Sequence, residues 1–197
     1  EFDAAAHHAL ARRAAEESLV LLKNEGALLP LAAGSKVAVI GDFAKNPRYQ
    51  GAGSSMVNST QVDVLLDKLI DSELNVIGYQ QGFDRHGKPD AALQKSACEL
   101  AAQANAVILC MGLDEIAESE GLDRSNLRLA QNQVDLLQAV KAVNPKIVVV
   151  LYSGSVVETP WLDNCQALLY AALGGQAGAG AVADALIGKV NPCGKLA

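Results

Sequence analysis

Short apolar runs alternate with amphipathic segments along most of the chain. The apolar runs are five to seven residues long, and several are rich in β-branched residues, which is typical of buried parallel strands. These runs are residues 36–40, 75–79, 106–111, 146–152 and 167–171. The segments between them carry apolar residues at helical intervals. They are residues 62–70, 89–104, 130–143 and 177–187.

This alternation indicates the class of fold. Strands that alternate with helices of about ten or more residues form right-handed βαβ crossovers, which build a sheet covered on both faces. The sequence therefore predicts an α/β fold, a flavodoxin-like three-layer sandwich with a mostly parallel sheet. The expected strand order is 2-1-3-4-5. Residues 174–180, rich in Gly and Ala, predict a tight turn into the last helix.

The beginning of the chain is predicted to be a further amphipathic helix. Residues 3–22 contain no glycine or proline, and Asn24, Glu25 and Gly26 provide a stop signal. Its apolar positions have mostly helical spacing. They are Leu10, Ala14, Leu19 and Leu22.

The length of 197 residues allows one compact domain. It is too short for a typical closed (β/α)₈ barrel of about 250 residues with anything attached. Half of the residues are hydrophobic and 19% are charged, so the chain has the composition of a folded protein with a substantial core.

The charge pattern argues against two classes of partner. The chain has 16 basic and 22 acidic side chains, a formal charge of −6, and no run of basic residues. Binding to nucleic acid needs clustered Lys and Arg, so we expect no nucleic-acid partner. The apolar runs are far shorter than the roughly 20 residues of a membrane helix, so we expect no membrane partner either.

Four scattered cysteines form no CxxC pair, and no histidine lies near them at metal-ligand spacing. We therefore expect free thiols, no metal site and no cofactor. The first fifteen residues also lack the basic start and apolar middle of a secretory signal. Because free thiols are typical of a reducing compartment, the cysteines predict a cytoplasmic location.

Two unusual loops follow the first and third predicted strands. In the expected order these strands are neighbours, and ligands bind at the carboxyl ends of such strands. The first loop, residues 42–59, contains the segment GAGSS at 51–55, whose small residues permit close approach to a ligand. The second, residues 112–129, is here called the acidic loop. Its five acids are Asp114, Glu115, Glu118, Glu120 and Asp123.

Each loop also has a plainer interpretation. Gly51-Ala52-Gly53 resembles part of a dinucleotide fingerprint, but it lies about ten residues past the strand and no GxGxxG follows. The acids could be a solvated loop, although long loops in compact domains are often functional. Composition alone leaves both interpretations of the acidic loop open.

Four motifs together resemble a known family. They are AAEESLVLLKN at 14–24 with LLPL at 28–31, RYQGAGSS at 48–55, ESEGLDR at 118–124, and NPCGKL at 191–196. In this order they resemble the C-terminal α/β sandwich domain of glycoside hydrolase family 3, the β-glucosidase family. The resemblance implies that residues 1–30 are an N-terminal helix and linker from a barrel domain that this chain lacks. Residues 31–197 would be the α/β sandwich domain.

The resemblance also implies roles for particular residues. The glutamate before the glycine of the acidic loop, Glu120, would be the general acid/base, and the nucleophilic aspartate would belong to the barrel. Glu118 is the alternative acid/base. Asp123 and Arg124 would either pair to shape the loop or reach sugar hydroxyls. Ser54 and Ser55 are assigned to the rim of the sugar site by the position of their loop.

The expected function is that of the C-terminal domain of a retaining β-glucosidase, which acts on terminal β-D-glucosyl residues. Retaining glycosidases need two carboxyl groups about 5 to 5.5 Å apart, so a domain with only one of them should be inactive alone. Without its partner, Glu120 should have a pKa near the ordinary glutamate value. The alternative is a non-catalytic flavodoxin-like module that binds a sugar or a nucleotide.

Overall fold

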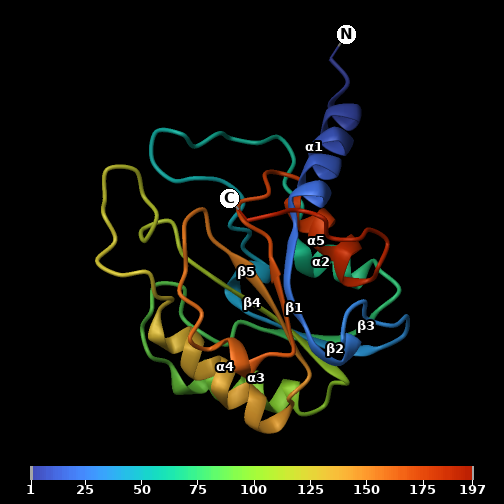
Figure 1. Cartoon of the computed structure of the whole chain (residues 1–197), viewed down its shortest axis with the longest axis vertical. Coiled ribbons are helices and arrows are strands. Elements are labelled where there is room, and N and C mark those ends of the chain that lie inside the picture. Colours follow the sequence, from blue (N-terminus) through green and yellow to red (C-terminus); the bar gives the residue numbers. More distant parts are fainter. Residues whose placement is uncertain (1, 197) are drawn as a thin grey trace.

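A six-stranded sheet crosses the molecule, with helices against both of its faces (Figure 1). The structure is a computed structural model that describes residues 2–196. The strands are β1 (Val20–Asn24), β2 (Lys36–Ile40), β3 (Asn75–Gln80), β4 (Ala106–Gly112), β5 (Ile147–Tyr152) and β6 (Ala167–Tyr170). They lie in the order β1-β6-β5-β4-β2-β3, and only the β1–β6 pair is antiparallel.

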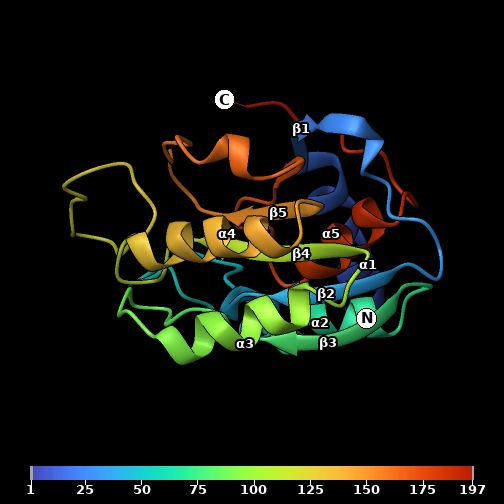
Figure 2. The same cartoon turned by 90° about the horizontal axis from the view of Figure 1, so that it is seen from below.

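The five predicted strands are β2 to β6, and they lie in the predicted 2-1-3-4-5 order. The helices are α1 (Ala4–Ser18), α2 (Leu65–Ile70), α3 (Ala91–Ala101), α4 (Gln131–Val143) and α5 (Gly178–Leu186). Helices α1 and α2 both pack on α5, while α3 packs on α4 across the other face of the sheet (Figure 2). The α/β class and the flavodoxin-like three-layer sandwich are therefore confirmed. Within residues 2–196, every helix is too short or too polar to cross a bilayer.

The central strands explain why the apolar runs were continuous. Every residue of β4 and of β5 is buried, because helices cover both faces of the sheet there. Strands β2 and β4 pair in parallel, with Ile40 opposite Leu109 near their carboxyl ends. The loops that follow these two strands therefore start side by side.

The predicted helix over residues 3–22 is wrong beyond Ser18. Helix α1 ends there, and the Ser18 hydroxyl donates to the carbonyl of Ala14 at 2.7 Å. The next residue, Leu19, has an extended backbone, and β1 follows it as an antiparallel neighbour of β6. Without β1, strand β6 would present unpaired backbone groups at the edge of the sheet. Leu19 and Leu22, which suggested the longer helix, lie outside α1, and Leu10 within it is 64% exposed.

The C-terminal segment, residues 191–196, also contacts this part of the chain. The amide of Gly194 donates to the carbonyl of Leu19 at 2.9 Å, so Gly194 lies against the residue that directly precedes β1. Strand β1 thus ties part of the first thirty residues to the sheet. That residues 1–30 lead in from a barrel domain stays a prediction.

Candidate active site

Two loops meet at the carboxyl ends of β2 and β4. The glycine-serine loop, residues 42–59, and the acidic loop, residues 112–129, leave the same end of the sheet (Figure 1). A parallel bridge between Ala52 and Ser119 joins their middle parts. The prediction that these loops lie together is confirmed.

Glu120 lies exposed directly after this bridge. Its Oε2 accepts a hydrogen bond from the amide of Ser54 at 3.0 Å and another from the Ser54 hydroxyl. Close packing permits this contact, because a Cβ on Gly53 would lie 2.9 Å from the Cβ of Glu120. The glycine-serine loop therefore binds the carboxylate of Glu120 and favours its ionised form.

These two donors change the acidity expected for Glu120. The side-chain hydrogen bond from Ser54, followed by the backbone hydrogen bond, lowers the pKa of Glu120 below its ordinary value of 4.5. The sequence predicted a return toward the ordinary value in a domain without its partner. The pKa lies lower because hydrogen bonds to a carboxylate favour its charged form.

Replacing Ser54 by alanine should raise the pKa of Glu120 toward 4.5, because only the backbone donor then remains. An NMR titration of the Glu120 carboxyl carbon in the 197-residue chain measures this change. The control is Ser55→Ala, which removes a neighbouring exposed hydroxyl that is not bonded to Glu120 in the described structure. Equal pKa values in the wild type and in Ser54→Ala would contradict the assigned contact.

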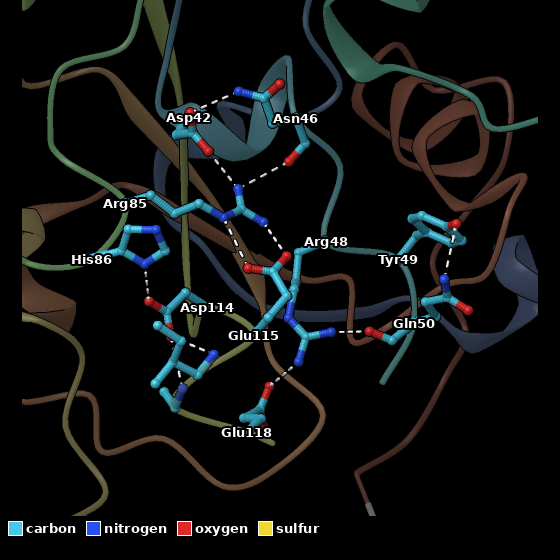
Figure 3. Close-up of polar contacts among 12 residues, drawn as sticks. Asp42, Asn46, Arg48, Tyr49, Gln50, Arg85, His86, Asp114, Glu115 and Glu118 are labelled. Carbon is cyan, nitrogen blue, oxygen red and sulfur yellow. Dashed lines mark hydrogen bonds and ion pairs between the residues drawn. The ribbon is translucent and has the colours of Figure 1, made fainter. Parts of the chain in front are cut away.

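Glu118 has a different environment from Glu120. Its side chain is only 8% exposed, and both of its carboxylate oxygens accept from the amide of Gly154 at 3.0 Å. The Ser155 hydroxyl donates to Oε1 at 2.5 Å, and Arg48 lies 3.4 Å from Oε2. Figure 3 shows Arg48 between the carbonyl of Gln50 and the carboxylate of Glu118. The carboxylate of Glu118 therefore already has hydrogen-bond and ion-pair partners within the protein.

The two other candidates in the acidic loop do not pair with each other. Within residues 2–196, no ion pair joins Asp123 and Arg124, so the pairing alternative is wrong. Arg124 instead donates to the hydroxyl of Ser155 at 2.9 Å and to the carbonyl of Val156 at 2.7 Å. Asp123 stays exposed. Arg124 shapes the loop, and Asp123 remains free for another contact.

Two open cavities flank the acidic loop. One, of about 450 Å³, is lined by Arg48, Glu118, Ser155 and Leu173 among others, and the second, of about 580 Å³, lies over His86 and Asp114. Asp123 and Arg124 border both. Each volume lies within the range of about 300 to 1,000 Å³ that is usual for ligand sites. In the part of the chain that the structure describes, no cluster of three or more His, Cys, Asp or Glu side chains could hold a metal ion.

Comparison with known proteins identifies the family. Residues 19–197 match the family described as "Glycosyl hydrolase family 3 C-terminal domain". The chain belongs to this family. The resemblance carried by the four sequence motifs is thereby confirmed.

The relatives of this family 3 domain are larger proteins. The whole chain is 44% identical to part of thermostable beta-glucosidase B of Acetivibrio thermocellus, covering 26% of that protein. It is also 44% identical to part of an exo-alpha-(1->6)-L-arabinopyranosidase of Bifidobacterium breve, covering 27% of it. A crystal structure of a GH3 beta-glucosidase from Bifidobacterium adolescentis matches 98% of the chain with a TM-score of 0.93 and 47% identity, over 28% of that protein. The chain thus spans about a quarter of the relatives' length.

A second polar network holds the base of the acidic loop in this family 3 domain. Arg85 donates to both carboxylate oxygens of Glu115, at 3.1 and 2.5 Å, and also to Asp42 (Figure 3). Burial opposes the ionisation of Glu115, but the hydrogen bonds from Arg85, a backbone hydrogen bond and the charges of Arg85 and Arg48 together outweigh it and lower the pKa of Glu115. Next to this network, Nδ1 of His86 lies 2.8 Å from Asp114. The loop is therefore held at its first residues as well as in its middle.

The structure brings the predicted residues together to different degrees. Ser54 contacts Glu120, while Ser55 is exposed on the same loop. Arg124 and Asp123 border the adjoining cavities. The catalytic role of Glu120 and the substrate-binding roles of the other four stay predictions.

Three side chains of this site had no role in the sequence analysis, namely Arg48, Arg85 and Ser155. Arg48 is part of the motif at 48–55, but arginine is usually exposed, so its residue type gave no sign that its side chain is buried. Ser155 follows a buried strand, and the loop after β5 opens at the same edge of the sheet as the acidic loop. The place of Ser155 after a buried strand was the one sequence feature that could have indicated it.

Proposed function

We propose that this domain supplies the general acid/base of a retaining glycosidase that hydrolyses terminal β-D-glucosyl residues. An N-terminal barrel of the same parent chain would supply the nucleophilic carboxylate. The observation that carries this proposal is the exposed carboxylate of Glu120, presented at the carboxyl ends of β2 and β4 by two loops that are bonded to each other. Ligands of open parallel sheets bind at this edge.

The proposed chemistry has two steps. In the first, protonated Glu120 gives its proton to the glycosidic oxygen as the bond from this oxygen to the anomeric carbon breaks, and the barrel carboxylate bonds to that carbon. In the second, ionised Glu120 takes a proton from water, whose oxygen attacks the anomeric carbon and releases the barrel carboxylate. The proton carried by Glu120 thus passes to the leaving group and is replaced from water.

The first step needs a protonated Glu120, whereas the hydrogen bonds of Ser54 favour the ionised form. The facing carboxylate of the barrel and the exclusion of water would raise the pKa of Glu120 in the complete enzyme. The domain alone therefore holds Glu120 in the form that serves the second step. The approach of the barrel would supply the form needed for the first.

The substrate site would be completed by other residues of the two loops. We assign Ser54 and Ser55 to its rim and Asp123 to a sugar hydroxyl, because these side chains are exposed beside Glu120. Arg124 would act on the substrate indirectly, by holding the loop that carries Asp123.

Two sugars are supported by the relatives. A β-D-glucoside is favoured because two of the three relatives compared above are named beta-glucosidases, but the third is named an arabinopyranosidase at the same 44% identity. Initial rates of the complete protein on p-nitrophenyl β-D-glucoside and p-nitrophenyl α-L-arabinopyranoside decide between them. The largest kcat/KM on the arabinopyranoside would replace the β-glucosidase assignment with the second one.

The 197-residue chain alone should not hydrolyse p-nitrophenyl β-D-glucoside, because it holds one of the two carboxyl groups that the reaction needs. The complete protein, assayed beside it, should hydrolyse this substrate. Hydrolysis by the isolated chain that is lost in Glu120→Ala would contradict the division of the site between two domains. Sugar or nucleotide binding by the complete protein without any hydrolysis would support a non-catalytic module instead.

A further inference from the structure

We propose that Ser155 is a positioning residue for Glu120. This inference rests on the proposed function, because it concerns how the acid/base loop is held. Ser155 lies in the loop after β5, residues 153–166, and it contacts the acidic loop at two points on either side of Glu120.

Both contacts go through one oxygen atom. The Ser155 hydroxyl donates to Oε1 of Glu118 at 2.5 Å and accepts from Nη1 of Arg124 at 2.9 Å. Glu118 comes two residues before Glu120, and Arg124 comes four residues after it. A single side chain therefore joins the two arms of the segment that presents Glu120.

The first arm is well anchored. Glu118 also accepts from the amide of Gly154, and its partner Arg48 has a side chain that is only 1% exposed. Gly154 itself packs closely, since a Cβ there would lie 2.8 Å from Cδ1 of Leu173. Because the anchor follows the fully buried strand β5, movement of this arm would disturb the core.

The second arm depends more directly on Ser155. Arg124 makes its hydrogen bonds to the Ser155 hydroxyl and to the carbonyl of Val156, and these connect the returning half of the acidic loop to the same β5-β6 loop. Loss of the hydroxyl would leave Arg124 with the carbonyl contact alone, although further along the loop Leu127 would still accept from the amide of Glu158 at 2.8 Å. The segment between the arms, with Glu120 exposed in it, would then have more freedom.

A positioning role and a substrate contact have different kinetic consequences. A misplaced acid weakens interactions made only in the transition state, so kcat falls while KM stays unchanged. A lost sugar contact weakens substrate binding as well and raises KM. An acid displaced by about 1 Å can cost up to about 100-fold in rate.

The test compares Ser155→Ala and Glu118→Gln in the complete glycosidase with Ser155→Thr, which keeps the hydroxyl. Both disrupting variants should lower kcat by up to about 100-fold with KM unchanged, and the threonine variant should restore most of the loss. The loss should be larger for poor leaving groups, which need the proton of the acid. The matched control is Ser96→Ala, which removes a serine hydroxyl that donates to the carbonyl of Ala92 within helix α3.

Added azide separates this proposal from the proposed function. Azide is a nucleophile that needs no general base. In Glu120→Ala, with a substrate that has a good leaving group, it can attack the anomeric carbon of the glycosyl-enzyme, release the barrel carboxylate, form a glycosyl azide and so restore turnover. It should not restore Ser155→Ala or Glu118→Gln, in which Glu120 is still present. If Glu120→Ala is fully active or is not restored by azide, the proposed function fails whatever Ser155 does. If Glu120→Ala behaves as an acid/base variant while Ser155→Ala and Glu118→Gln keep wild-type kcat, or only raise KM, the positioning role alone is overturned.

Discussion

Glu120→Ala in the complete protein is expected, under the proposed function, to lower kcat/KM about 100- to 10,000-fold on substrates with poor leaving groups, the range that proton transfer by a positioned side chain contributes. Glu120 is an exposed carboxylate of the acidic loop, whereas Glu118 is bonded to Gly154, Ser155 and Arg48. Removal of Glu120 should therefore remove the proton donor and its two hydrogen bonds from Ser54, while the contacts of Glu118 still hold the acidic loop. Steady-state rates over a series of aryl β-glucosides measure the effect.

Two features distinguish this result from a general loss of structure. The loss should shrink as the leaving group becomes more acidic, since a good leaving group departs without a proton. The alkaline limb of the pH profile of kcat/KM should also disappear, because activity no longer depends on a protonated Glu120. Glu99→Gln is the matched control, since Glu99 is an exposed glutamate on α3, 3.8 Å from Lys95. An equal loss on all leaving groups would contradict the acid/base assignment.

Gly41→Ala is expected to have the largest effect on stability, a loss of more than about 4 kcal/mol in the free energy of unfolding. Gly41 directly follows β2 and has a φ of +111°, a conformation that residues with a side chain rarely adopt. A Cβ there would also lie closer than 3.0 Å to the carbonyl oxygen of Cys110 in β4, a distance that real Cβ atoms essentially never show. The substitution would push apart the two strands from which the loops of the candidate site start. Urea unfolding of the 197-residue chain measures the loss.

Two other glycines provide matched controls. Gly34 also has a positive φ, +72°, but nothing lies within 4 Å of its Cβ position, so Gly34→Ala should cost only the backbone strain of about 1 to 2 kcal/mol. Gly178, at the start of α5, has neither problem, and Gly178→Ala should be neutral or stabilising by up to about 1 kcal/mol. A Gly41→Ala variant no less stable than Gly34→Ala would show that the two strands can separate at little cost.

Most of the sheet could be predicted because its central strands are buried on both faces. Such strands appear in a sequence as continuous apolar runs, and Val37–Ile40 and residues 106–111 are of this kind. The meeting of the two loops followed from the same prediction, because neighbouring parallel strands end at the same edge. The bridge between Ala52 and Ser119 confirms it.

The edge strand β1 could not be predicted in the same way. Its residues continue an apolar pattern with helical spacing, and no glycine or proline separates them from α1. The backbone changes at Leu19 because β6 offers a row of hydrogen-bonding groups and the C-terminal segment contacts the same residue through Gly194. Both partners are more than 140 residues away along the chain. A local pattern does not contain such contacts.

For the candidate site, too, local sequence patterns predicted one part and long-range contacts decided the other. The sequence by itself determined that an acidic loop and a glycine-serine loop lie at one edge of a parallel sheet, and its motifs indicated Glu120 and the family. Only the tertiary structure decided that Glu118 is buried against Arg48 while Glu120 stays exposed two residues later. The physical reason is that a carboxylate becomes buried only where donors from other segments meet it. For Glu118 these donors, Arg48, Gly154 and Ser155, come from two other loops and are brought together by the folded sheet.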